Sequence, residues 1–296
     1  MARDPRPAWL KRIPDVFRSG AGRTRTSPAR RFLPRLEGLE DRTTPAVVTL
    51  APTADDTLYQ SSTSSPSQQL SNGGGQHFYV GETAQGANAL RRGAIKFDLS
   101  SIPAGSTITA VTLTLNMSLT VSGAQTVALH RALANWTEGT SNSGPGGQGP
   151  GEGDGTAATT GDVTWFYSSF PNQTWATPGG DFVTAASAST SVATVGSYQW
   201  TGAGLVADVQ QWVNHTAGNF GWILTGNEAA ARSAKQFDTK ENANPANRPA
   251  LTITFTPPVS DLTVTKAHTG TFRQGDAADA YTITVRNAGS GPTAGP

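Results

Sequence analysis

The sequence predicts an all-β fold, a jelly-roll-like antiparallel β-sandwich with one short helix. Apolar and polar residues alternate with a period of two in several segments, which is the pattern of half-buried strands. Charged residues make up only 15% of the 296 residues, and glycine occurs 33 times. This composition is typical of an all-β protein with many turns. Counting the segments gives about nine or ten strands and one helix, which favours a sandwich.

The clearest strands lie within residues 92–115. Two sets of apolar residues there alternate with polar or small neighbours: Ile95, Phe97 and Leu99, and then Val111, Leu113 and Leu115. Between the two sets, Ser100, Pro103 and Gly105 supply turn chemistry. We therefore expect the two strands to pair as an antiparallel hairpin that buries one face and leaves the other in water.

Shorter runs predict the remaining elements. The other strands are expected at residues 47–50, 57–59, 77–81, 125–133, 198–201, 222–225 and 251–255, with one or two more in 181–197. The helix is expected near residues 205–213, because Leu205, Val209, Trp212 and Val213 recur at helical spacing while Asp208 faces outward. This helix would cap one end of the sandwich.

Two stretches predict loops. Residues 61–76 are rich in Ser and Gly, and residues 139–161 form a glycine-rich tract with seven Gly between 144 and 155. Such a tract buries too little to order itself, so we expect a loosely held surface insertion. Glu152 and Asp154 in this tract are candidate calcium ligands, but the D-x-D-x-D-G spacing is missing. No cofactor is therefore predicted, and structural calcium has no support from the spacing.

Four motifs in order along the chain carry a family resemblance. They are IKFDLSSIPAGSTITAVTLTL from Ile95, NWTEG from Asn135, LVADVQQWVNHTAGNFGWILTG from Leu205 and FDTKENANPANRPALTITF from Phe237. This order resembles the DNRLRE domain, also classed as carbohydrate-binding module family 96, over roughly residues 47–257. In the last motif Thr239 stands where the family usually has Ser. The resemblance implies a non-catalytic domain that holds a polysaccharide, and family members are linked to the uronate polymer alginate.

Two designs could hold such a polymer. Neutral sugars stack on exposed aromatic rings, for which the candidates are Trp165, Tyr167 and Trp175, whereas Trp136, Trp212 and Trp222 are expected in the core. Acidic sugars need basic side chains that meet carboxylates, and the candidates are Arg91, Arg92, Lys96, Lys235, Lys240 and Arg248. Residues 47–296 carry 11 Lys and Arg against 16 Asp and Glu, a net charge of −5. This balance opposes an anionic polymer unless the basic residues are clustered.

The two ends of the chain differ from the sandwich. Residues 1–46 carry a net charge of +6 and no hydrophobic period, which predicts a disordered arm. Within this arm RLEGLEDRTTPA, at residues 35–46, resembles the L-E-x-L-E-D-R-x-x-P-A tag of many large bacterial extracellular proteins, and this implies export. At the other end, Pro257 and Pro258 form a stiff linker. Residues 261–295 then resemble the first half of an Ig-like surface repeat, the conserved-repeat domain of unknown function, family eleven. We expect this repeat to be incomplete within residues 258–296.

The composition excludes several kinds of site. The chain contains no cysteine, which excludes disulfides, thiolate metal sites and a cysteine nucleophile. The four His are far apart, and no nucleophile elbow or P-loop occurs. Glu138 and Asp98 lie inside the family-type motifs, so the resemblance implies a structural role for them, and the protein is predicted not to be an enzyme. The sequence has no run of 18 apolar residues, so no transmembrane segment is predicted. The net negative charge of residues 47–296 gives no indication of nucleic-acid binding.

The sequence thus predicts polysaccharide binding by an exported or cell-surface bacterial protein that is associated with the cell envelope. Two alternatives remain open. The domain could be a structural stalk or adhesion domain, or the accessory domain of a polysaccharide-degrading enzyme whose catalytic part lies outside this sequence. Binding requires a basic or aromatic cluster on one concave face, whereas the stalk predicts that the motif residues are all buried.

Overall fold

The computed structural model describes residues 44–60, 69–84, 89–144, 151–275, 277 and 280–293. In these residues strands predominate and one α-helix is present, so the predicted all-β class is confirmed. The arm at residues 1–43, with most of the predicted export tag, lies outside the described residues. Residues 61–68 and 145–150, in the two predicted loops, also lie outside them.

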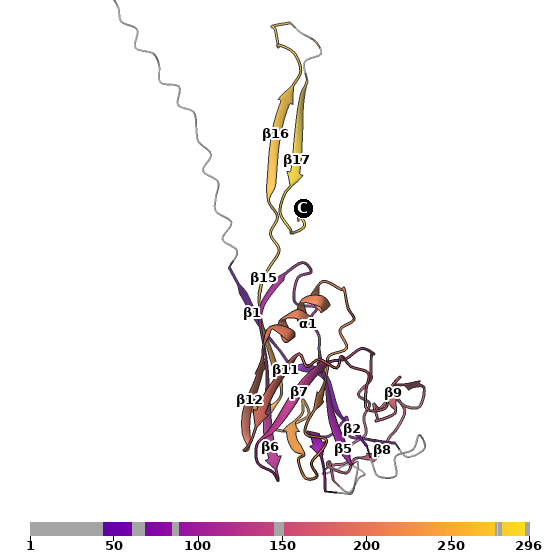
Figure 1. The fold of residues 1–296 in the computed structure, drawn as a ribbon. Helices are drawn as coiled ribbons and strands as arrows, with labels where there is room; N and C mark the ends of the chain where they lie inside the picture. The colour runs from indigo at the N-terminus through magenta and orange to yellow at the C-terminus, as the bar shows by residue number, and fades with distance from the viewer. Residues whose placement is uncertain are drawn as a thin grey trace, which may run out of the picture. The chain divides into compact units, whose positions relative to one another are not determined.

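Eleven strands form one curled antiparallel sheet. They are β1 (Ala46–Leu50), β2 (Pro52–Tyr59), β4 (His77–Glu82), β5 (Leu90–Phe97), β6 (Thr107–Thr120), β7 (Gln125–Arg131), β11 (Ala188–Val192), β12 (Gly196–Thr201), β13 (Trp222–Thr225), β14 (Lys235–Asp238) and β15 (Ala250–Thr256). Their order is β1-β15-β6-β14-β4-β5-β13-β7-β11, with β12 beside β6 and β2 beside β5. The sheet curls over itself as a half-barrel, so that its two halves face each other across one core, as in a β-sandwich (Figure 1).

The remaining strands form three separate pairs. Near the glycine-rich tract, β3 (Leu70–Ser71) pairs with β8 (Thr156–Ala157), and β9 (Tyr167–Ser169) pairs with β10 (Gln173–Thr174). A short 3-10 helix, η1 (Pro245–Asn247), precedes β15. In the tail, β16 (Leu262–His268) and β17 (Tyr281–Asn287) pair with each other as an antiparallel hairpin. Both strands lie in the predicted Ig-like repeat, of which the structure describes residues 258–275, 277 and 280–293.

The core confirms the alternation seen in the sequence. Ile95 and Phe97 on β5 and Leu113 and Leu115 on β6 are buried in one cluster, to which Leu99 also belongs. Ala94 is buried as well, because a second apolar cluster lies on the other face of β5. β5 is therefore covered on both faces, where the alternation predicted one face in water.

The predicted hairpin between the two central strands is wrong. β5 pairs with β2 along one edge and with β4 and β13 along the other, so both of its edges are occupied. β6 pairs instead with β12, β14 and β15. The turn at residues 98–106 therefore carries the chain from one half of the curled sheet to the other. Ile102 anchors this crossing, since it is buried in the same core as β5 and β6.

The helix α1 (Ala203–Val213) lies across one end of the curled sheet (Figure 1). It buries Leu205, Val209, Trp212 and Val213, as predicted. The expectation that Asp208 faces outward is wrong. Its carboxylate accepts a 2.8 Å hydrogen bond from Trp222 Nε1 and another from a serine hydroxyl, and it lies 3.2 Å from an arginine Nε of β7. These partners compensate the burial of the charge.

The described ends of the glycine-rich tract are packed, in contrast to the predicted loose insertion. Ser143 and Glu152 are buried, on either side of residues 145–150. The amide of Ser143 donates to the side-chain oxygen of Asn72, and its hydroxyl donates to the carbonyl of Gly151. Hydrogen bonds to a neighbouring loop thus supply the order that apolar burial cannot supply in this composition.

Removing core volume should destabilise the sandwich strongly. Leu113 is fully buried between the two halves of the sheet, so Leu113→Ala is expected to lower the free energy of unfolding by about 2–5 kcal/mol. Val121→Ala is the control, because Val121 is 63% exposed and its loss should cost no more than about 0.5 kcal/mol. Urea unfolding of the two variants measures both values, and equal costs would contradict the described core.

Candidate functional site

Two of the three residues of the predicted aromatic platform are buried. Trp165 and Trp175 are only 5% and 4% exposed and pack in the second apolar cluster of the sandwich. The indole of Trp175 donates a 3.0 Å hydrogen bond to the carbonyl of Thr164. Tyr167 is half-buried, with its ring edge-on to Phe170 at 5.2 Å. The expectation of an exposed stacking surface is therefore not met by the two tryptophans.

The other described tryptophans are also internal. The three that were expected in the core, Trp136, Trp212 and Trp222, are each less than 5% exposed, and so is Trp200. Trp212 and Trp222 pack together with their ring centroids 4.7 Å apart. In the part of the chain that the structure describes, no tryptophan offers an open face to a sugar ring.

Two of the predicted basic residues are fully enclosed. Arg91 is 1% exposed, and its guanidinium donates to the carbonyls of Gln60 and Gly153 while it lies over the ring of Tyr59. Lys235 is 0% exposed, and its ammonium donates to Thr120 Oγ1 and to two backbone carbonyls. Burial lowers the pKa of both side chains. Neither can meet a carboxylate of a polymer at the surface.

Arg92 and Lys96 are partly exposed but engaged. The guanidinium of Arg92 makes two hydrogen bonds to Glu228, at 2.7 and 2.8 Å, and lies over the ring of Trp165. Arg92 also lines a surface hollow of about 600 Å³, but the bidentate contact already neutralises its charge there. The ammonium of Lys96 donates to the carbonyl of Trp136 at 2.6 Å and lies 4.8 Å from the centre of that ring.

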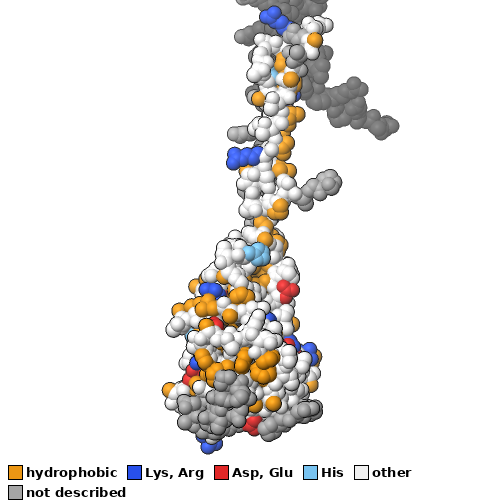
Figure 2. All heavy atoms as spheres, turned by 90° about the vertical axis from the view of Figure 1, so that its right-hand side faces the viewer, with side chains coloured by type: hydrophobic (Ala, Val, Ile, Leu, Met, Phe, Trp, Pro, Cys, Tyr) orange, Lys and Arg blue, Asp and Glu red, His pale blue; other side chains and the backbone are white. Residues whose placement is uncertain are grey.

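The last two basic candidates stand apart from these. Lys240 pairs with two carboxylates, those of Glu138 and Glu241. Arg248 is exposed and donates to the carbonyl of Asn242. On the face in Figure 2 the Lys and Arg side chains are scattered and do not gather into one patch. The six residues therefore do not combine into the basic groove that a polyuronate would need.

Glu152, a candidate calcium ligand in the glycine-rich tract, has other partners. Its carboxylate lies 2.6 Å from His77 Nδ1 and accepts a hydrogen bond from the amide of Gln76. His77 also lies 3.4 Å from Asp238 through its other ring nitrogen. Burial lowers the pKa of His77, but the hydrogen bond and charge of Glu152 and the charge of Asp238 raise it by more, so the net shift is upward.

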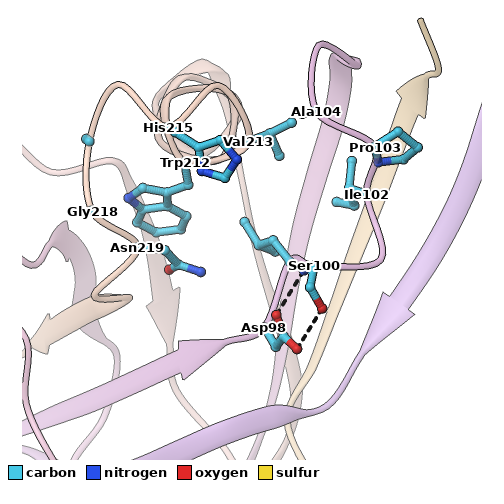
Figure 3. A pocket seen from close by; sticks show the side chains of 12 residues that line it. Asp98, Ser100, Ile102, Pro103, Ala104, Trp212, Val213, His215, Gly218 and Asn219 are labelled. Carbon is cyan, nitrogen blue, oxygen red and sulfur yellow. Dashed lines mark hydrogen bonds between the residues drawn. The ribbon is translucent and has the colours of Figure 1, made fainter. Parts of the chain in front are cut away.

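An open cavity lies at the end of the sandwich that α1 covers (Figure 3). We call it the helix-end cavity. Its volume is about 690 Å³, within the range of ligand pockets in proteins. It is bounded by the turn after β5, the last turn of α1 and the loop that follows the helix. The polar side chains on its wall are those of Asp98, Ser100, Trp212, His215 and Asn219.

The wall of the helix-end cavity presents both donors and acceptors. Asp98 is exposed, and hydrogen bonds from the amide and hydroxyl of Ser100 lower the pKa of its carboxyl, so it is charged at neutral pH. Asn219 donates to the carbonyl of Phe97, which fixes the orientation of its amide. Among the described atoms, Asn219 Oδ1 and Trp212 Nε1 find no hydrogen-bond partner. Both atoms are closed to solvent, and an unmet buried polar group costs about 1–3 kcal/mol.

Sequence reasoning did not select this cavity. Its residues come from two motifs that are distant in the chain, DLSSIP after β5 and HTAGN after α1, and only the fold brings them together. The signal that the sequence offers for this cavity is a cluster of polar and turn residues directly after β5 and another directly after α1. The sequence predicts a turn for the first cluster, and the structure has turns at both places.

Comparisons with known proteins leave the family resemblance a prediction. No protein-family model matches the sequence, and no curated protein matches it. Among the described residues, no helix combines the length and the apolar character needed to cross a membrane.

The contacts of His77 predict a pH-dependent stability. Because its pKa in the folded state is raised above the ordinary value of about 6.5, its contribution is fully present below that pH and is lost as the pH rises through the folded pKa. His77→Gln should therefore reduce the gain in unfolding free energy between about pH 8.5 and pH 5.5.

Urea unfolding of the wild-type protein and the variant at both pH values measures this difference. His215→Asn is the matched control, since His215 is exposed and makes no ion pair in the described part of the chain. An unchanged pH dependence in His77→Gln would contradict the described pairing with Glu152 and Asp238.

Proposed function

We propose that the sandwich is a non-catalytic domain that binds a polysaccharide, in an exported or cell-surface bacterial protein, and that it does so at the helix-end cavity. The observation that carries this proposal is the cavity itself, in which charged, amide, imidazole and hydroxyl groups line a space of about 690 Å³. A sugar hydroxyl both donates and accepts hydrogen bonds, so it complements a wall of this mixed kind. The ordered family-type motifs, two of which border the cavity, support the same proposal.

The charge of the cavity favours a neutral glycan over a uronate. Asp98 is ionised at neutral pH, because its hydrogen bonds from Ser100 favour the charged form. A carboxylate accepts well from sugar hydroxyls, but it repels the carboxylate of a uronate. None of the six basic side chains that were expected to offset this repulsion lines the helix-end cavity. Arg91 and Lys235 are buried, and Arg92 and Lys240 are paired with carboxylates. We therefore propose a neutral, hydroxyl-rich polymer in place of alginate.

A structural stalk is the second candidate, and a specific observation favours it. Side chains of the family-type motifs already have hydrogen-bond partners within the fold. Trp136 donates to the carbonyl of Phe220, and Glu138 accepts from the amide of Asp55. A spacer needs nothing more than such internal contacts. The two candidates differ in one respect, since only the binding domain requires the helix-end cavity to hold a ligand.

Affinity electrophoresis of the full chain should separate the two candidates. The native gels would contain a neutral glucan, xylan, pectin or alginate, each at low and high salt. We expect a neutral polymer to retard the protein, and Asp98→Ala to weaken the retardation by about 10–100-fold in affinity, because a hydrogen bond to a charged group contributes about 1.5–3 kcal/mol. Asn219→Ala should weaken it as well.

The control variant is Arg248→Ala, which removes an exposed charge outside the cavity wall and should leave the retardation by the neutral polymer unchanged. Retardation by alginate that fades with salt, and that Arg248→Ala reduces while Asp98→Ala does not, would instead support a basic binding face. A protein that no polymer retards would favour the stalk.

A further inference from the structure

Three carboxylates from distant parts of the sequence meet beside the sandwich. Asp55 lies on β2, Glu138 follows β7, and Glu241 follows β14. One oxygen from each of them lies within 4.8 Å of the others. Metal–oxygen distances for calcium are about 2.3–2.6 Å, so two ligands on opposite sides of the ion are about 4.8 Å apart. The three oxygens are therefore close enough to share one cation.

Two of the carboxylate oxygens in this cluster lack partners. Asp55 is fully buried, and its Oδ1 is closed to solvent and meets no hydrogen-bond donor among the described atoms. The same holds for Glu241 Oε2. Asp55 Oδ2, in contrast, accepts a 2.9 Å hydrogen bond from the amide of Lys240. A buried carboxylate oxygen without a donor is rare in a folded protein, and it points to a missing positive partner.

The only cation described in this cluster does not complete it. The ammonium of Lys240 lies 2.9 Å from Glu138 Oε2 and contacts Glu241 Oε1, but it makes no described hydrogen bond to Asp55. With all groups ionised, three carboxylates and one ammonium leave a formal charge of −2. The Lys240 side chain is 23% exposed, so it has a route out to solvent.

We propose that Asp55, Glu138 and Glu241 form a calcium site, in which Ca²⁺ takes the position between the three carboxylates and the Lys240 ammonium withdraws toward solvent. Calcium fits because every side-chain ligand in the cluster is a hard oxygen, and no His or Cys ligand belongs to the group. Carboxylates can bind it with one oxygen or two. Because Glu138 and Glu241 are partly exposed, water can supply the remaining ligands.

A cation at this position would join three segments that only the fold brings together. It would connect β2, the loop after β7 and the loop after β14 in a chain that has no cysteine for disulfides. Binding to the folded state alone stabilises a protein by mass action. The site would therefore act as a structural clamp, in a different place from the carboxylates of the glycine-rich tract.

The test uses the full chain, stripped of metal with a chelator and then titrated with CaCl₂. Isothermal titration calorimetry should show one Ca²⁺ bound per chain, and the thermal unfolding midpoint should rise with the logarithm of free Ca²⁺. Changes in outer-shell partners alone cost metal sites about 10–100-fold in affinity. We therefore expect the loss of a direct ligand in Glu241→Gln to weaken binding by at least about tenfold.

Two further variants make the result decisive. Asp261→Asn removes an exposed carboxylate outside the cluster and should bind Ca²⁺ like the wild type. Lys240→Gln removes the competing ammonium and should bind Ca²⁺ at least as tightly, provided that circular dichroism shows a native fold. No heat of binding and no shift of the unfolding midpoint in the wild-type protein would overturn the inference and leave Lys240 as the permanent counter-charge. Equal binding by Glu241→Gln and the wild type would overturn it as well.

Discussion

The pairing of β4 with two neighbours is the constraint on which the rest of the sandwich depends. Residues His77 to Val80 pair with β14, and the next two residues pair with β5, so one strand serves both halves of the curled sheet. The curl sets β5 and β6 face to face across the core, where a hairpin would have placed them side by side. It also sends the turn after β5 across the end of the sandwich, where it meets the loop after α1 and encloses the helix-end cavity.

The charged residues of the sandwich are used mainly to hold loops together. Arg91 donates to backbone carbonyls, Asp208 joins α1 to a tryptophan of β13, and Glu152 joins the glycine-rich tract to His77 on β4. Each of these contacts compensates the desolvation of a buried charge, which would otherwise be costly. A charged side chain that is buried or paired within the fold cannot also contact a ligand at the surface. The family-type motifs are therefore compatible with a fold-defining role, and the binding proposal has to rest on the cavity.

The sequence could predict features that depend on local pattern, such as which strand residues are buried. It could not predict features that depend on tertiary partners, such as which strands pair. Alternation placed Ile95 and Leu113 correctly in the core, and helical spacing located α1. The same alternation could not say which strands pair, because the edges of β5 are taken by strands from distant parts of the chain. Residue type likewise could not separate an enclosed arginine such as Arg91 from an exposed one such as Arg248, since that depends on the carbonyls packed around it.

The two proposed sites share one electrostatic basis. Residues 47–296 carry 11 basic and 16 acidic side chains, and the basic ones among the predicted binding residues are largely internal or paired. The field near such a domain attracts a divalent cation and repels a polyanion. This excess of negative charge is seen at two places: at Asp55, which has a carboxylate oxygen without a hydrogen-bond donor, and at Asp98, which is ionised in an open cavity. A neutral glycan at the cavity and a cation between the carboxylates follow from one charge balance, whereas a polyuronate would have to overcome that balance at both places.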